Sequence, residues 1–166
     1  MGRTVTAPDI NGTLHEIELN SLRWRPSMYG IVIQDDTLLV SPQFRGYDLP
    51  GGGLEIGEML EDGVTREVWE ETGLRVANPR IVGVTSNFFV LPGSTKGVNV
   101  QSILLYYACD LVGGELSDAN FDPYERENSR FPEWLPLSQL DSIDVASSYD
   151  WREIVKKVAK GENTGD

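Results

Sequence analysis

The chain has 166 residues, a formal net charge of −12 and a single cysteine. This length fits one compact domain spanning residues 1–166, and the apolar fraction of 40% is typical of a globular protein. Because the surface is strongly acidic, it repels nucleic-acid backbones. No apolar run approaches the roughly 18 residues that a membrane-spanning helix needs. We therefore expect neither a nucleic acid nor a membrane as a partner.

The cysteine and histidine content limits the possible metal sites. Cys109 lies in the apolar stretch 102–109, so we expect a buried, unreactive thiol, and it has no partner for an intrachain disulfide. His15 is the single histidine, which excludes zinc sites built on several histidines and cysteines. Any metal must therefore be held by oxygen ligands. The absence of disulfides favours a reducing cytoplasm as the location.

The first third of the chain reads as short strands and turns. Residues 4–19 alternate loosely around Asn11-Gly12, which is a strong hairpin signal, and we treat 1–22 as an N-terminal hairpin extension. Two apolar strands and a glycine-rich loop follow, at 28–33, 38–41 and 46–53.

The rest of the chain predicts a mixed sheet between helices. A helix is predicted over 58–72, and Gly73 is placed to form its left-handed C-terminal cap. The further predicted elements are long strands at 80–90 and 98–111, a mobile polar loop at 117–130, a short strand at 134–137, an amphipathic helix at 147–159 and a flexible tail at 161–166. Strands interleaved with two helices favour an α/β sandwich.

The predicted helix over 58–72 carries an unusual acidic stripe. Glu67, Glu70 and Glu71 stand at i, i+3 and i+4, so their carboxylates share one side of the helix beside Val64 and Val68. Like charges at this spacing destabilise a helix by a few tenths of a kcal/mol per pair. Carboxylates gathered at a core margin need a partner, and a hard divalent cation is the natural one.

The glycines that precede this helix add a second feature. Gly51, Gly52 and Gly53 let the backbone turn sharply and approach another group closely. A backbone carbonyl there could point at the same cation, and amides could face a phosphate. The interpretation of these glycines as a dinucleotide-binding motif is excluded, because the G-x-G-x-x-G pattern is missing and the helix is densely acidic.

The spacing of the whole segment resembles the Nudix box, G-x5-E-x7-R-E-U-x-E-E-x-G-U, where U is aliphatic. Every specified position matches between Gly52 and Leu74, including Glu58 and Arg66. So many fixed positions are very rarely matched by chance at ordinary residue frequencies. An ordinary solvated acidic helix after a loop is therefore disfavoured. Flanking features, such as the entry 49–52 and the stretch 133–137, also resemble the family.

The resemblance implies a Nudix-like α/β/α sandwich with a mixed β-sheet, to which this chain adds the N-terminal β-hairpin. It also implies hydrolysis of a diphosphate bond in a nucleoside diphosphate-linked substrate or a nucleoside triphosphate. Magnesium is the usual metal, and manganese is an acceptable substitute.

By matching position, the resemblance implies roles for several residues. Glu67, Glu70, Glu71 and the carbonyl of Gly51 would bind metal. Glu67 or Glu70 would activate the attacking water, and the sequence does not rank the two. Arg66 would hold a box glutamate in place, and Glu58 would brace the loop.

A further carboxylate often joins the site from a distant loop in this family. Here that loop would be 117–130, where Glu127 is the first candidate and Glu125 the second. The alternative is that both are ordinary solvated charges.

Several residues are candidates for contacting the substrate. Arg45 and Lys96 lie in loops and could meet phosphates, as could the amides of Gly52 and Gly53. Tyr47 and Phe88, or the adjacent Phe89, could stack on a base. The alternatives are surface cations and, for the phenylalanines, core packing, because one of two adjacent strand residues must face the core.

Nothing in the sequence names the substrate. The motif of the NADH-cleaving group is not recognisable, and Pro92 lies beyond the place where ADP-ribose-cleaving members tend to carry a proline. The main alternative is a non-catalytic Nudix-like domain that binds or senses a nucleotide, although such domains usually lose box glutamates. An isoprenoid diphosphate isomerase would need further metal-binding histidines. A homodimer formed through the hairpin at 4–19 is a further hypothesis.

Overall fold

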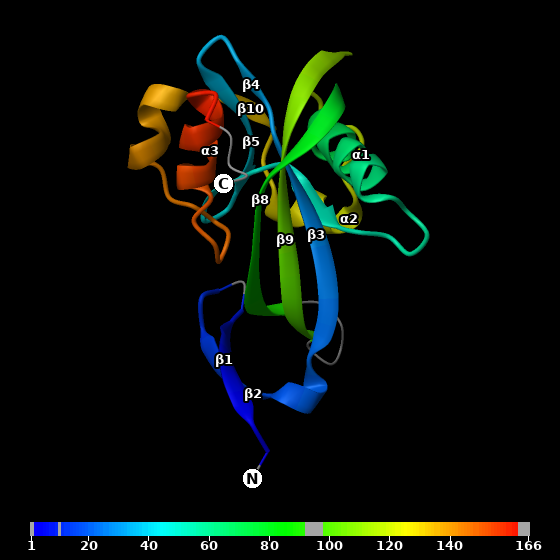
Figure 1. The fold of residues 1–166 in the computed structure, drawn as a ribbon, viewed down its shortest axis with the longest axis vertical. Coiled ribbons are helices and arrows are strands. Elements are labelled where there is room, and N and C mark those ends of the chain that lie inside the picture. The colour runs from blue at the N-terminus through cyan, green and yellow to red at the C-terminus, as the bar shows by residue number, and fades with distance from the viewer. Residues whose placement is uncertain (1, 10, 92–97, 163–166) are drawn as a thin grey trace.

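The computed structural model describes residues 2–9, 11–91 and 98–162 of the chain (Figure 1). Its centre is a four-stranded sheet in which β3 and β9 run parallel and the other neighbours run antiparallel. In spatial order the strands are β7 (Gly51–Gly53), β3 (Arg23–Ile31), β9 (Val98–Gly114) and β8 (Leu74–Leu91). This is the mixed sheet that the sequence predicts.

A second, smaller sheet lies beside the central one and carries strands from both halves of the chain. Its strands are β10 (Glu133–Pro136), β5 (Thr37–Gln43) and β4 (Ile33–Gln34), with β6 (Gly46–Asp48) paired to β5. Asp35 and Asp36 form the tight turn between β4 and β5, and both have positive φ angles, 48° and 59°. Such left-handed pairs suit a two-residue hairpin, because they match the twist of the strands.

Helices cover both sides of the central sheet, as Figure 1 shows with α1 (Leu60–Thr72) on one side and α3 (Arg152–Ala159) on the other. Successive side chains of β9 point to opposite sides of the sheet and so contribute to two separate cores. Leu105 and Tyr107 face the core under α1, whereas Leu104 and Tyr106 face the core under α3. The Nudix-like α/β/α sandwich is therefore confirmed.

The N-terminal hairpin is also present. Strand β1 (Thr4–Pro8) pairs antiparallel with β2 (Leu14–Glu18), and the short helix η1 (Leu19–Ser21) leads into β3. The Asp9 carboxylate accepts hydrogen bonds from the amides of Asn11 and Thr13 and so closes the turn. The hairpin packs on β8 of its own chain through the bridge from Asp9 to Val90.

The prediction of a loop over 46–53 is wrong, because this segment contains strands β6 and β7. Glycine makes the second strand possible. A Cβ added to Gly51 would lie 2.2 Å from the carbonyl oxygen of Met28 on β3. Only a residue without a side chain can pair this closely, so a sequence that looks like a flexible turn forms part of the sheet.

The predicted mobile loop over 117–130 contains a short helix, α2 (Pro123–Asn128). Asp122 and Glu125 form a reciprocal capping box, and Pro123 occupies the first turn. These are the features that start a helix even in a polar segment.

The predicted C-terminal helix over 147–159 is too long at its start, since α3 begins at Arg152. Ser147 accepts a hydrogen bond from the Tyr149 amide, and Asp150 accepts one from the Arg152 amide. Such side-chain acceptors compete with helical hydrogen bonds and favour turns.

Three further predictions concern the cysteine, the C-terminal tail and membrane-spanning helices. Cys109 is buried, as expected, and burial raises the pKa of its thiol to about 12. Most of the predicted tail, 163–166, lies outside the described residues. Among the helices that the structure describes, none has the length and apolarity required to cross a membrane.

Gly73 closes α1 in the left-handed conformation, with φ of 75°, as the sequence predicts. A Cβ at this position would lie 2.5 Å from the carbonyl oxygen of Glu115. Gly161 has a similar φ of 69° but nothing within 4 Å of such a Cβ. We expect Gly161→Ala to cost about 1 kcal/mol from backbone strain alone, and Gly73→Ala to cost roughly 2–4 kcal/mol. Urea unfolding of both variants measures the difference, and equal losses would show that the contact with Glu115 adds nothing.

Candidate active site

The site begins with two glutamates that α1 holds at the edge of the core. Glu67 and Glu71 lie one helical turn apart and are only 7% and 8% exposed. Val64 and Val68 on the same helix are fully buried and fix its orientation against the sheet. The packing of α1 therefore places both carboxylates where water has little access.

A third glutamate reaches these two from α2. One carboxylate oxygen from each of Glu67, Glu71 and Glu125 lies within 4.8 Å of the others. Glu127, the first loop candidate from sequence, is exposed and does not belong to this cluster. The capping box explains the choice, because it holds Glu125 at the first turn of α2 and leaves Glu127 on its outer side.

Burial and mutual repulsion make these three carboxylates resist ionisation. Burial raises the pKa of Glu67 to about 7 and raises that of Glu71 well above its ordinary value. Burial and the charges of Asp122 and Glu70 raise the pKa of Glu125. Oε2 of Glu71 is buried and has no hydrogen-bond partner in the described chain. A divalent cation would supply the missing partner and offset the repulsion, so the donor set fits a hard metal ion.

Arg66 occupies the neighbouring position and binds three carboxylates at once. Its Nε lies 2.7 Å from Oε1 of Glu58, and its Nη1 lies 3.0 Å from Oε1 of Glu67 and 2.8 Å from Oε2 of Glu70. Glu58 also accepts a hydrogen bond from the amide of Glu55, which ties the loop to the helix. Arg66 is therefore committed to orienting the acidic groups and has little capacity left for a substrate.

The structure does not bring Glu70 into the carboxylate cluster. Its side chain is 34% exposed and pairs with Arg66 on the outer side of the helix. Glu70 also does not line the cleft described below, whereas Glu67 and Glu71 do. The predicted acidic stripe thus divides in two: Glu67 and Glu71 face inward, and Glu70 belongs to the arginine network.

The glycines of β7 form the wall opposite these glutamates. A Cβ at Gly52 would lie 2.7 Å from Oε1 of Glu67, and one at Gly53 would lie 3.0 Å from the guanidinium of Arg25. The backbone of Gly51–Gly53 therefore approaches charged side chains directly.

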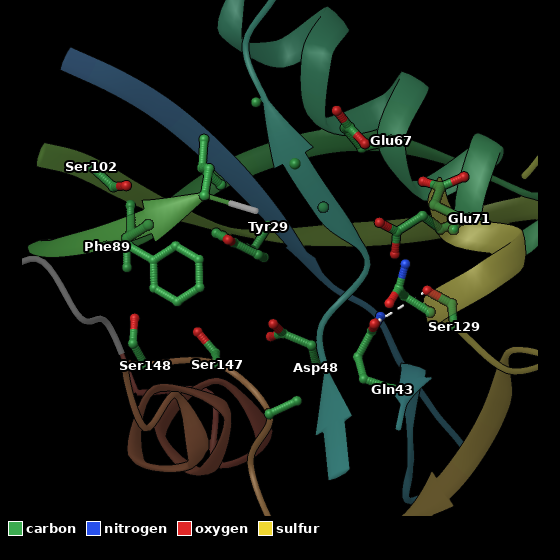
Figure 2. Close-up of a pocket in the computed structure, with 18 of the residues that line it drawn as sticks. Tyr29, Gln43, Asp48, Glu67, Glu71, Phe89, Ser102, Ser129, Ser147 and Ser148 are labelled. Atoms are coloured by element: carbon green, nitrogen blue, oxygen red, sulfur yellow. Dashed lines mark hydrogen bonds between the residues drawn. The ribbon is translucent and has the colours of Figure 1, made fainter. Parts of the chain in front are cut away.

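A cleft of about 710 Å³ connects the glutamates to a polar and aromatic region on the far side (Figure 2). Its volume lies within the range of small-molecule sites. At one end it is lined by the glycines of β7, Glu67, Glu71 and Glu125. The far side holds Asp48, Phe89, Ser147 and Ser148.

The predicted substrate contacts divide in the structure. Arg45 lines the cleft, and its Nη1 donates a hydrogen bond to the carbonyl oxygen of Asn11 at the tip of the hairpin. Phe89 lines the cleft and Phe88 does not, since adjacent strand residues point to opposite sides. Tyr47 does not line it either. Lys96 lies outside the described residues.

Tyr47 lies away from the cleft because the fold uses it elsewhere. Its backbone exchanges hydrogen bonds with the segment 144–146, and its ring packs against the core under α3. A hydrogen bond to Glu133 raises the pKa of its phenol.

Three charged residues of the cleft are not predicted from the sequence, namely Arg25, Asp48 and Asp122, the last of which caps α2. Arg25 reaches the cleft because β3 begins five residues earlier than expected from the apolar run at 28–33. Asp48 falls in the segment predicted to be a loop, whereas β6 places it beside Ser41 of β5. For Arg25 and Asp48 the missing information is strand pairing, which no local pattern in the sequence supplies.

Comparison with known proteins identifies the family. The family model of the NUDIX domain matches residues 23–154, which is most of the chain. The chain belongs to the Nudix family. It is a pyrophosphohydrolase of the Nudix type, in agreement with the complete motif and the clustered carboxylates.

Relatives of this Nudix chain carry several names. A "MutT-like protein" of Streptomyces ambofaciens is 30% identical over 78% of this chain and 86% of its own length. An "ADP-ribose pyrophosphatase" of Methanocaldococcus jannaschii is also 30% identical, over 81% of this chain and 72% of its own.

Solved structures support the fold. A Nudix hydrolase from Nitrosomonas europaea aligns with a TM-score of 0.65 at 18% identity, over 85% of this chain and 92% of its own. A MutT protein from Bacillus halodurans aligns with a TM-score of 0.61 at 28% identity, over 81% of both chains.

The arginine network of this Nudix protein can be tested by a conservative change. Arg66→Lys keeps the positive charge but removes the planar fork that binds Glu58, Glu67 and Glu70 together. We expect a loss of about 1–3 kcal/mol in the free energy of unfolding. Arg80→Lys is the matched control, because Arg80 forms an exposed pair with Asp110 that is worth about 1 kcal/mol or less. Equal losses in chemical unfolding would contradict a special role for Arg66.

Proposed function

We propose that the chain hydrolyses a diphosphate bond in a nucleoside diphosphate-linked substrate or a nucleoside triphosphate, in a reaction that depends on Mg²⁺, with Mn²⁺ as a substitute. The observation that carries this proposal is the cluster in which the half-buried Glu125 joins the buried Glu67 and Glu71 beside the β7 glycines. The names of the relatives agree with a nucleotide substrate, since they include an ADP-ribose pyrophosphatase and an oxidized purine nucleoside triphosphate hydrolase.

In this proposal Glu67, Glu71 and Glu125 hold the metal, together with the carbonyl of Gly51. Their raised pKa values and the unpartnered oxygen of Glu71 support this assignment. When bound, the metal neutralises the diphosphate and lowers the pKa of a coordinated water. Glu70 acts through Arg66, which fixes the position of Glu67.

The chain's own groups then carry the proton and orient the substrate. Glu67 is our choice for the base that takes a proton from the attacking water, because it lines the cleft and Glu70 does not. The water oxygen bonds to phosphorus, and the bond to the bridging oxygen breaks. The leaving phosphate departs with that oxygen.

Arg25 is the cation that we assign to the substrate's second phosphate. It lines the cleft and lies over Gly53, and its guanidinium donates a hydrogen bond to the hydroxyl of Ser27. Among the residues that the structure describes, it forms no ion pair with an acid. Arg66, by contrast, is already bound to three carboxylates. A guanidinium without an acidic partner is suited to binding a phosphate through two parallel hydrogen bonds.

The alternative is a non-catalytic domain that senses a nucleotide. The intact carboxylate cluster and the committed Arg66 favour catalysis, since a simple binding site has no need for three repelling acids. A cytoplasmic location remains a prediction. A homodimer through the hairpin also remains a prediction, and within one chain the hairpin already packs on β8.

Replacing Glu71 tests the metal site. We expect Glu71→Gln to reduce turnover with Mg²⁺ by roughly 10² or more, because a lost ligand costs several kcal/mol of charge stabilisation. Without metal its unfolding midpoint should not fall, since the amide removes a buried charge beside two other acids, and one oxygen of that carboxyl lacks a partner. Adding MgCl₂ should raise the midpoint of the parent protein but not that of the variant. Glu127→Gln, the exposed control, should behave like the parent. A Glu71→Gln variant with normal turnover would overturn the proposal.

The base can be identified by comparing two amide variants at saturating Mg²⁺. We expect Glu67→Gln to lower the single-turnover rate by roughly 10²–10⁴, because it removes the proton acceptor. Glu70→Gln should have a smaller effect on the rate and should mainly lower stability through the loss of an Arg66 contact. The reverse order would assign the base to Glu70.

A further inference from the structure

Asp48 is a half-buried acid that the proposed chemistry does not use. It lies on β6, three residues before the β7 glycines, and lines the cleft without belonging to the carboxylate cluster. Its carboxyl is deep enough that burial raises its pKa to about 7. A buried carboxyl is costly to keep, so its presence at a cleft wall calls for an explanation.

The protein surrounds this carboxyl with hydrogen-bond donors. The Leu49 amide donates to Oδ1 at 2.8 Å. The buried indole N–H of Trp151 makes no hydrogen bond in the described chain, but it lies close enough to lower the pKa of Asp48. Among the described residues no cation contributes to that pKa. Asp48 therefore acts as an acceptor in this structure, and it lines the cleft.

A second acceptor at the cleft also lacks a partner. Asn87 donates through Nδ2 to the hydroxyl of Ser148, but its Oδ1 is buried without a hydrogen bond in the described chain. Asn87 and Phe89 are two residues apart on β8, so their side chains point the same way, and both line the cleft. Unsatisfied acceptors thus gather beside an aromatic ring.

The position of this group separates it from the phosphate site. In Figure 2, Asp48, Ser147 and Phe89 lie across the cleft from Glu67 and Glu71. Phosphate oxygens are acceptors and carry negative charge, so they would be repelled by Asp48 in its ionised form. The part of the substrate that reaches this end must instead present N–H donors and a flat surface that can stack on Phe89.

Resting on the proposed function, we infer that Asp48 selects the base of the substrate, and that the preferred base is a guanine-type purine. Its N1–H and N2–H₂ groups are adjacent parallel donors, and they match the two oxygens of a carboxylate. Adenine presents a donor beside an acceptor at the same edge, which leaves one carboxylate oxygen facing a lone pair. Sites that hydrogen-bond a substrate N–H discriminate strongly against analogues that lack it.

The variant Asp48→Asn tests this inference, because an amide presents one donor and one acceptor, the pattern that suits adenine. We expect the parent protein to prefer GTP over ATP, and GDP-glucose over ADP-glucose, by at least about tenfold in kcat/KM. In Asp48→Asn this ratio should fall by about tenfold or more. Asp110→Asn, which makes the same change at an exposed residue of β9, should keep the parent ratio.

Equilibrium binding of GMP and AMP without metal separates the possible failures. A preference for GMP that Asp48→Asn removes, with no turnover of any nucleotide, would overturn the proposed function but keep the role of Asp48. Turnover with an unchanged base ratio in Asp48→Asn, or an equal loss for both bases, would show that Asp48 only supports the fold. A parent protein that prefers the adenine nucleotides would also overturn the inference.

Discussion

The site depends on the cost of keeping several carboxylates together at the edge of a core. Glu67 and Glu71 are held there by the packing of α1, and Glu125 is brought to them by the cap of α2. Their repulsion is only partly relieved by Arg66, which binds Glu67 but not Glu71. The protein therefore accepts an unfavourable arrangement that a divalent cation would reverse, as expected when stability is given up at a functional site.

The glycines of β7 are the second constraint, and they connect the sheet to the chemistry. Pairing with β3 requires Gly51 to approach the Met28 carbonyl, while Gly52 leaves room for the Glu67 carboxylate. The short strand β7 therefore approaches β3 closely at Gly51 and the Glu67 side chain closely at Gly52. For this reason the segment is rigid although its composition is that of a flexible loop, and its backbone groups hold fixed positions at the cleft wall.

The sequence predicts most of the elements, because their signals are local. The cap at Gly73 and the hairpin around Asn11-Gly12 are both decided by neighbouring residues. The spacing of the box likewise predicts Glu67 and Glu71. The remaining features depend on contacts between distant segments. The placement of α2 decides that Glu125 and not Glu127 joins the carboxylate cluster. The placement of β8 decides that Phe89 and not Phe88 lines the cleft. Arg25 and Asp48 can be recognised as cleft residues only once the pairing of β3 with β7 and of β6 with β5 is known.

The two ends of the cleft follow opposite electrostatic rules, and this difference limits how a substrate can lie. At the glutamate end, negative charge attracts a cation, and a cation in turn attracts phosphate. At the Asp48 end no cation of the described chain shifts its pKa, so the same negative charge repels phosphate and favours N–H donors. A molecule with a phosphate chain at one end and a donor-bearing ring at the other satisfies both rules in only one direction. The cleft can therefore set the orientation of the diphosphate before any chemical step, because reversing the substrate would place phosphate against an unpaired acid.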